Sequence, residues 1–211
     1  MTMATRKTPT IVSIREFWSY FARAAPFLAG NLLNEKMQDE LDLQVARLGS
    51  ALSWEIGPGS SKPNALAISP GGDPDLLSIT RTVISEAPPI DGWEFHPAKP
   101  PKKWDLQFSL SEGSEVVDVD ARSWRYTLLD FGDGVYDLTL EAQNLNAVGD
   151  ELRSAAGEAL VEGILGEERR IEVIGRIDVV TRMSRGAAKE AGPIANLAMH
   201  VEELTSTTSA S

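Results

Sequence analysis

The chain has 211 residues, a formal net charge of −11 and no cysteine. Without cysteine, the protein has no disulfide, no thiolate nucleophile and no cysteine-based zinc or iron–sulfur site. The negative charge argues against nucleic acid and anionic membranes as ligands, because both would be repelled. The hydrophobic fraction of 42% and the charged fraction of 24% are typical of a soluble globular protein.

The sequence also indicates where the protein acts. The first residues, Met1–Pro9, contain no apolar run of the kind that a secretory signal needs. No stretch approaches the roughly 18 apolar residues of a transmembrane helix. We therefore expect a cytoplasmic monomer or homodimer that does not bind membranes. The acidic surface serves solubility or a basic protein partner.

Two amphipathic helices are predicted near the N-terminus, after a flexible arm of residues 1–12. A capping box at Ser13–Glu16 opens the first helix, in which aromatic side chains recur at helical spacing. The second helix, residues 32–50, places its apolar side chains on one stripe and its acidic side chains outside. We expect residues 13–50 to form a helical extension of the protein.

Residues 51–204 predict an α+β domain, followed by a disordered tail at 205–211. Most expected strands alternate apolar and polar side chains, which predicts an antiparallel-rich sheet with helices on one face. The order strand–strand–helix–strand occurs at 51–97 and again at 123–181, which suggests a duplicated unit. Strands are expected at 52–56, 65–69, 92–96, 104–110, 115–120, 124–130, 135–141 and 170–180, and helices at 73–87, 146–165 and 194–204.

Five segments follow one another in an order that resembles a family of uncharacterised bacterial proteins. They are LSWEIG, LAISPGG, EAPPIDGWEFHPAKPP, YTLLDFGDGVYDLTL and LGEERRIEVIGRIDVV. The resemblance is most specific in the W-x-F-x-x-A-K-x-P pattern at Trp93–Pro101. It implies a soluble bacterial α+β protein of unknown function and brings no catalytic residues. A second similarity, in element order alone, is to GyrI-like ligand-binding modules.

Two glycine-containing motifs resemble nucleotide-binding motifs in letters only. Asp130–Gly132 reads DFG, but no other kinase segment accompanies it, and a hairpin turn explains it. Gly57–Asn64, GPGSSKPN, lacks the GK[ST] ending of a phosphate loop and leads into a strand, whereas a phosphate loop leads into a helix. Neither motif therefore predicts nucleotide binding.

Residues suited to metal binding are few. Asp118 and Asp120 share one face of a strand and are weak candidates for a hard cation, but no further ligand recurs at a fixed spacing. His96 and His200 are too few for a three-histidine zinc site, and His200 is expected at the surface. We expect no metal and no cofactor.

The segment Gly92–Asp105, GWEFHPAKPPKKWD, is the best candidate for a binding site. In a strand, Trp93 and Phe95 point into the core, and Glu94 and His96 point to the polar face. The prolines that follow would present lysines on a stiff, extended loop; the alternative is a solvated loop without a ligand. The predicted ligand-binding residues are Glu55, Trp93, Glu94, His96, Lys99, Lys102 and Lys103.

Three functions fit these features. The acidic surface and the lack of catalytic motifs favour a non-enzymatic binding or interaction protein. One alternative is a small-ligand sensor with a groove between the two repeated units. Another is an enzyme that uses His96 as a general base, oriented by Glu55 or Glu94.

Overall fold

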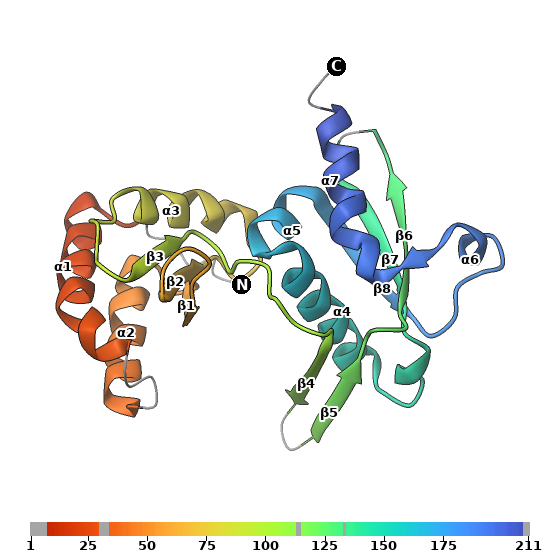
Figure 1. Ribbon diagram of the computed structural model, residues 1–211, viewed down its shortest axis with the longest axis horizontal. Helices are drawn as coiled ribbons and strands as arrows, with labels where there is room; N and C mark the ends of the chain where they lie inside the picture. Colours follow the sequence, from red (N-terminus) through yellow and green to blue (C-terminus); the bar gives the residue numbers. More distant parts are fainter. Residues whose placement is uncertain (1–7, 30–33, 113–114, 133, 209–211) are drawn as a thin grey trace, which may run out of the picture. The chain divides into compact units, whose positions relative to one another are not determined.

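The chain folds into two compact units, Met1–Pro100 and Pro101–Ser211, each with its own hydrophobic core. A computed structural model shows their elements (Figure 1). The residues that it describes are 8–29, 34–112, 115–132 and 134–208. Within these ranges, no helix is both long enough and apolar enough to cross a membrane.

The first unit packs helices on a small mixed sheet. β1 and β2 form an antiparallel hairpin, with Trp54 opposite Ile68. β3 then pairs with β2 in parallel, with Phe95 opposite Leu66, and α3 supplies the crossover that parallel pairing requires. The elements are α1 (Ile11–Leu28), α2 (Glu35–Leu48), β1 (Ser53–Pro58), β2 (Asn64–Ser69), α3 (Pro74–Ser85) and β3 (Trp93–His96).

An aromatic cluster joins α1 to β3 in the core of this unit. Trp18 and Phe21 of α1 contact Phe95 edge-on, with ring centroids 4.7 and 5.7 Å apart. Phe21 also contacts Trp93, at 5.0 Å. The indole N–H of Trp18 donates to the carbonyl of Val83 in α3 at 2.8 Å. Trp93 and Phe95 therefore face the helices, as their alternation along the strand predicts.

The second unit repeats this connectivity. β6 and β7 form an antiparallel hairpin, with Leu128 opposite Leu138. After α4 and α5, β8 pairs with β7 in parallel, with Ile177 opposite Leu138. β4 and β5 form a separate pair, and β9 pairs with the start of β6. The elements are β4 (Gln107–Glu112), β5 (Glu115–Asp120), β6 (Arg125–Asp130), β7 (Tyr136–Glu141), η1 (Gln143–Leu145), α4 (Asp150–Leu165), α5 (Glu167–Val173), β8 (Ile174–Val180), α6 (Ala187–Glu190), β9 (Gly192–Pro193), η2 (Ile194–Asn196) and α7 (Leu197–Thr208).

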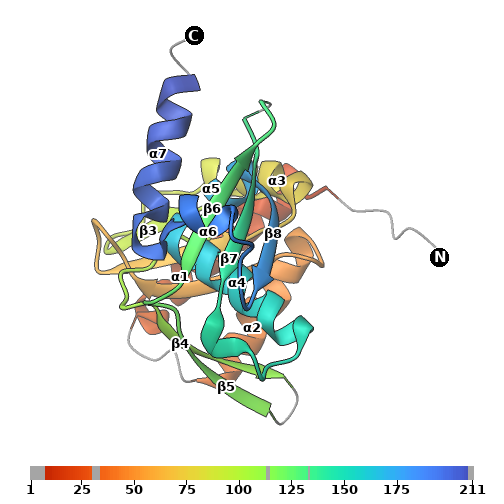
Figure 2. The same ribbon diagram turned by 90° about the vertical axis from the view of Figure 1, so that its right-hand side faces the viewer.

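α4 and α7 pack on one face of the β6–β7–β8 sheet. Gly157 brings α4 close, because a Cβ at this position would overlap a methyl group of Val179 and lie 3.3 Å from Leu140. Tyr126 of β6 contacts His200 of α7, with ring centroids 5.8 Å apart, and α7 runs beside β6 (Figure 2). These contacts bury the apolar face of the sheet.

The fold belongs to the α+β class that the sequence predicts, and antiparallel strand pairs outnumber parallel ones. The strands form separate sheets, however, and not a single sheet. The division falls after Pro100, whereas an extension ending near residue 50 was expected. Pro97, Pro100 and Pro101 explain where the first sheet ends, because proline cannot donate to a strand ladder. Duplication of the two units stays a hypothesis.

The start of α1 differs from the sequence interpretation. The helix begins at Ile11, inside the arm expected at residues 1–12. Thr10 caps it, since its Oγ1 accepts a hydrogen bond from the backbone N–H of Ser13 at 3.2 Å. The expected capping box at Ser13 is therefore one turn too late, and residues 1–7 of the arm lie outside the described residues.

Helix also replaces the expected structure near the C-terminus. α5 (Glu167–Val173) occupies the first part of the strand expected at 170–180; its two glutamates in the first turn favour a helix start. α7 continues to Thr208, through most of the tail expected at 205–211. The remainder of that tail, 209–211, lies outside the described residues.

Candidate functional site

Glu94, one of the predicted site residues, holds the loop between β1 and β2. Its carboxylate accepts hydrogen bonds from the backbone N–H groups of Ser60, Ser61 and Lys62 at 2.7, 2.8 and 3.1 Å. The hydroxyls of Ser60 and Ser61 add two more, at 3.1 and 2.5 Å. These donors, the Ser61 hydroxyl first among them, hold the pKa of Glu94 far below its ordinary value. The loop of the GPGSSKPN segment thus encloses an anion, and that anion is the protein's own carboxylate.

His96 lies beside Glu94 on the same face of β3. Its Nε2 is 3.1 Å from Glu94 Oε1, and its side chain is 30% exposed. The strand register places Glu55 on this face as well, with Ala67 of β2 between Glu55 and His96. A histidine held by a carboxylate has the arrangement of a general base, but most hydrogen-bonding capacity of Glu94 is used by the loop.

The remaining predicted site residues are Trp93, Lys99, Lys102 and Lys103. Trp93 is buried on the opposite face of β3. Lys99 belongs to the first unit, whereas Lys102 and Lys103 belong to the second. The backbone N–H of Lys102 donates to the Gly163 carbonyl of α4 at 2.8 Å, which fixes that part of the loop. Of the predicted set, the strand register brings Glu55, Glu94 and His96 onto one face of the first sheet.

Asp118 and Asp120 each have a partner within the β4–β5 region. Ser109 donates to Asp118 at 2.6 Å. Arg122 donates to both carboxylate oxygens of Asp120, at 2.8 and 2.5 Å, and its hydrogen bonds lower the pKa of Asp120 to about 2. Among the residues that the structure describes, no group of three or more histidine and carboxylate side chains is placed to hold a metal ion.

His200 is partly buried, whereas the sequence leads us to expect an exposed side chain. Its Nδ1 lies 2.9 Å from the hydroxyl of Tyr126. Tyr126 is only 3% exposed, and burial raises the pKa of its phenol, with a further contribution from Glu203. The pair therefore joins α7 to the sheet, and the raised pKa makes the phenol a weaker acid.

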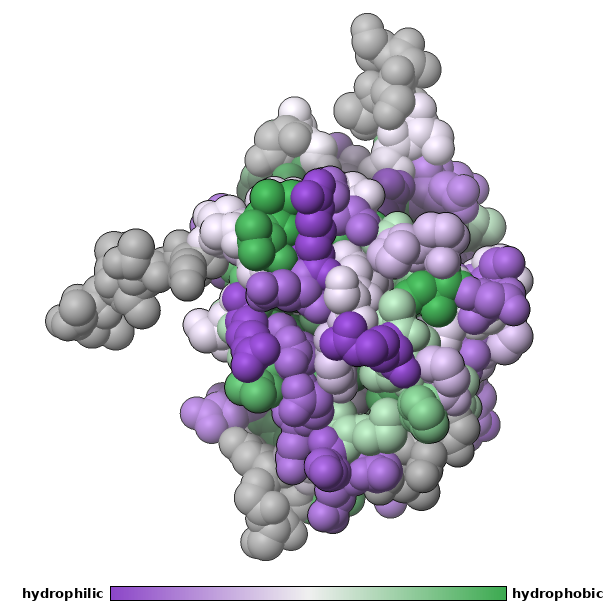
Figure 3. All heavy atoms as spheres, turned by 90° about the vertical axis from the view of Figure 1, so that its left-hand side faces the viewer, coloured by the Kyte–Doolittle hydropathy of each residue, from purple (hydrophilic) through white to green (hydrophobic). Residues whose placement is uncertain are grey.

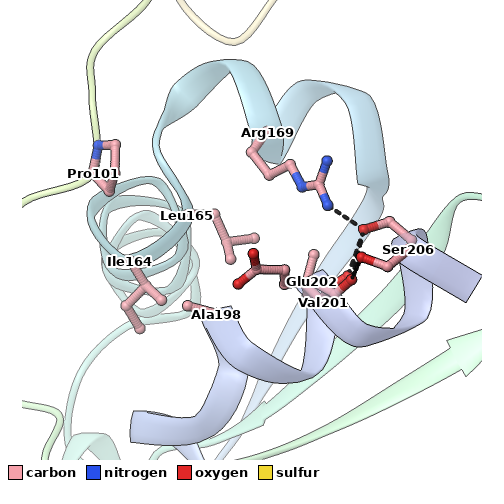
Figure 4. A pocket seen from close by; sticks show the side chains of 9 residues that line it. Pro101, Ile164, Leu165, Arg169, Ala198, Val201, Glu202 and Ser206 are labelled. Atoms are coloured by element: carbon pink, nitrogen blue, oxygen red, sulfur yellow. Dashed lines mark hydrogen bonds between the residues drawn. The ribbon is translucent and has the colours of Figure 1, made fainter.

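A groove in the second unit is a candidate site that sequence reasoning missed. It has a volume of about 620 Å³, within the range of small-ligand sites, and lies between α7 and the junction of α4 and α5 (Figure 4). Its apolar side chains are Ile164, Leu165, Ala198 and Val201. The polar side chains are those of Arg169, Glu202, Thr205 and Ser206, and Pro101 completes the lining.

Arg169 is held at the edge of this groove by α7. Its Nη2 donates to the Thr205 hydroxyl, which in turn donates to the Val201 carbonyl at 2.9 Å. Among the described residues, no carboxylate pairs with Arg169. The Glu202 carboxylate extends over the groove toward Leu165 in Figure 4, and no described residue bonds to it. The groove thus carries two opposite charges that do not neutralise each other.

Two other hollows lie in the first unit. One, of about 670 Å³, lies between α1 and α2, where hydrophilic side chains form a band on the face seen in Figure 3. It carries Arg15, Arg23 and Arg47, but all three side chains are exposed. The other, of about 720 Å³, follows α3 and is lined mainly by apolar side chains beside Trp93. Neither combines a half-buried cation with an apolar floor.

Sequence reasoning misses the groove because it expects other structure at its polar edge. It places Thr205 in a disordered tail and Arg169 immediately before a strand. In the structure, both belong to helices. A signal was present in the sequence: Ala198, Val201 and Thr205 recur at helical spacing, which extends the helical face beyond Leu204.

Comparisons with known proteins give no information on function, so the functional argument rests on the geometry described above. No family model, no curated protein and no solved structure matches the chain. The resemblances to a family of uncharacterised bacterial proteins and to GyrI-like modules therefore stay predictions.

Proposed function

We propose that the protein is a non-catalytic binding protein whose ligand occupies the groove beside α7. The observation that carries this proposal is Arg169, a half-buried cation with a hydroxyl partner and no carboxylate partner among the described residues. Guanidinium groups bind carboxylates through paired, charge-assisted hydrogen bonds. A small organic acid with an apolar body would meet Arg169 with its carboxylate and the apolar side chains of the groove with its body.

The proposal is supported by the hydrogen bonds of other titratable groups, which are already occupied by partners within the protein. Glu94 is engaged by its loop, Asp120 by Arg122, and Tyr126 by His200. In contrast, the groove keeps its charged groups available. An acidic protein also benefits from a local arginine, because the net charge of −11 would otherwise repel an acid.

Binding of branched acids tests this function. The chain is titrated with 4-methylpentanoate and with its neutral amide, and chemical shifts of Ala198 and Val201 are followed by NMR. We expect the acid to bind more tightly than the amide. Arg169→Gln should weaken binding of the acid by about tenfold or more, the loss expected for a charge-assisted hydrogen bond.

Arg176→Gln is the matched control, because Arg176 is an arginine of the same unit on β8, paired with Asp137 and Asp178 and outside the groove. It should leave binding unchanged. Equal affinity for acid and amide, or an Arg169→Gln variant that binds as well as the parent chain, would show that the proposed function is wrong.

A second candidate is an enzyme with His96 as general base, favoured by the 3.1 Å contact between His96 and Glu94. It predicts an activity that His96→Ala abolishes and Glu55→Gln reduces. If an activity is found and persists in the His96→Ala variant, His96 is not its general base. The sensor with a groove between the two units also stays a prediction, since the groove described here lies within the second unit.

A further inference from the structure

We infer that the groove takes a zwitterion: an aliphatic amino acid whose carboxylate meets Arg169 and whose ammonium group meets Glu202. This inference rests on the proposed binding function and names the chemical class of the ligand. It starts from the two opposite charges in one groove. Arg169 and Glu202 both line it, yet they form no ion pair with each other or with another described residue.

The anchoring of Arg169 explains why the two charges stay apart. Its guanidinium donates to Thr205, and the Thr205 hydroxyl is itself bound to the carbonyls of Val201 and Glu202, at 2.9 and 3.2 Å. The guanidinium is therefore directed toward Thr205 at the end of α7, whereas the Glu202 carboxylate extends the other way, toward Leu165 (Figure 4). The Glu202 carboxylate extends from the preceding turn of the helix over the apolar floor. A cation and an anion are thus presented separately to the same space.

Charge decides which ligands this space favours. A simple acid is attracted by Arg169 but repelled by Glu202, and a simple amine meets the reverse. A ligand with both groups has favourable interactions with each side chain. Specificity of this kind arises because the unfavourable charge rejects ligands that lack its partner.

The floor of the groove indicates the third part of the ligand. Ile164, Leu165, Ala198 and Val201 supply aliphatic surface in the same groove. Among the described residues, no aromatic side chain lines the groove, so an aromatic ligand would have no ring to stack on. An aliphatic side chain attached to a carbon that bears both charged groups matches this arrangement, as in leucine.

Three compounds with the same branched body test the inference. Leucine carries both charged groups, 4-methylpentanoate lacks the ammonium group, and 3-methylbutylamine lacks the carboxylate. Titrations of the full chain are followed by NMR at one pH and ionic strength. We expect leucine to bind about tenfold more tightly than either of the other two, the ratio that one charge-assisted contact supplies.

Variants assign the two contacts. Glu202→Gln should bring the affinity for leucine down to that for 4-methylpentanoate, while 4-methylpentanoate binds as well as before or better. Arg169→Gln should weaken both ligands. Glu190→Gln is the control, because Glu190 is an exposed glutamate of α6 outside the groove, and it should change nothing.

The outcomes separate this inference from the function on which it rests. If leucine and 4-methylpentanoate bind equally and both need Arg169, the binding function stands and the zwitterion is wrong. If Glu202→Gln leaves the preference for leucine intact, the inference is also overturned. If none of the three compounds binds, the proposed function itself fails.

Discussion

Glu94 and His96 lie on one face of β3 with a 3.1 Å contact, and the same Glu94 carboxylate accepts five hydrogen bonds from Ser60, Ser61 and Lys62. The contact with His96 is therefore one of six around this carboxylate. Backbone N–H groups that converge on an anion are the means by which many loops bind phosphate or carboxylate. Here, β3, the strand that pairs with β2 in parallel, supplies the anion, so the arrangement closes the loop of the first unit.

Removal of this carboxylate should release the loop. Glu94→Ala leaves the N–H groups of residues 60–62 without their acceptor, and we expect a lower melting temperature and faster amide exchange in the loop. Acetate should restore part of the lost stability, because it fits the space and the charge of the missing side chain. Glu55→Gln is the control on the same face and should have little effect. If the Glu94→Ala chain melts at the same temperature as the parent chain, with or without acetate, the hydrogen bonds of Glu94 do not stabilise the loop.

The contribution of Glu94 to the free energy of unfolding should also depend on pH. The pKa of Glu94 is lowered from its ordinary value of 4.5 by hydrogen bonding, so its contribution is present above the unfolded pKa and is lost as the pH falls toward the folded pKa. The difference in unfolding free energy between the parent chain and Glu94→Gln should therefore be constant near neutral pH and shrink below about pH 4.5. Urea unfolding followed by tryptophan fluorescence at several pH values measures this. A difference that persists unchanged in acid would show that the charge of Glu94 is not involved.

Gly157 should be required for the approach of α4 to β8. Alanine is the better helix former by about 1 kcal/mol, but its Cβ would overlap the rigid Val179 side chain. Overpacking typically costs about 1–3 kcal/mol, so we expect Gly157→Ala to lower the unfolding free energy. Ser154→Ala, on the exposed side of the same helix, should be neutral or slightly stabilising. A stabilised Gly157→Ala chain would mean that helix propensity outweighs packing at this position.

The Tyr126 hydroxyl should stabilise the second unit through its hydrogen bond to His200. Tyr126→Phe removes the 2.9 Å bond and keeps the ring, which should cost about 1 kcal/mol. Tyr136→Phe is the matched control: Tyr136 is equally buried, at 3% exposed, and no described residue bonds to its hydroxyl. Chemical denaturation of both variants measures the difference. Equal losses would show that the bond to His200 contributes nothing specific.

Local signals in the sequence were enough to predict most elements. The alternation of Trp93, Glu94, Phe95 and His96 predicted which side chains enter the core, because successive strand residues point to opposite faces. The turn residues between β6 and β7 predicted that hairpin, with boundaries within one residue of those observed. These features depend on neighbours in the chain, and a single sequence contains them.

The α+β class, the amphipathic helices and the hairpins can be predicted from the sequence, since period, caps and turns are local properties. The division of the strands into sheets and the partner of each polar group depend on contacts between residues far apart in the chain. Glu94 meets Ser61 from 33 positions away, and Arg169 meets Thr205 from 36. No local pattern encodes such partners, because they are selected by the packing of whole elements. For that reason, the predicted site at Glu94 turns out to hold a loop in place through hydrogen bonds. The groove depends on the packing of α5 against α7, which the sequence does not show.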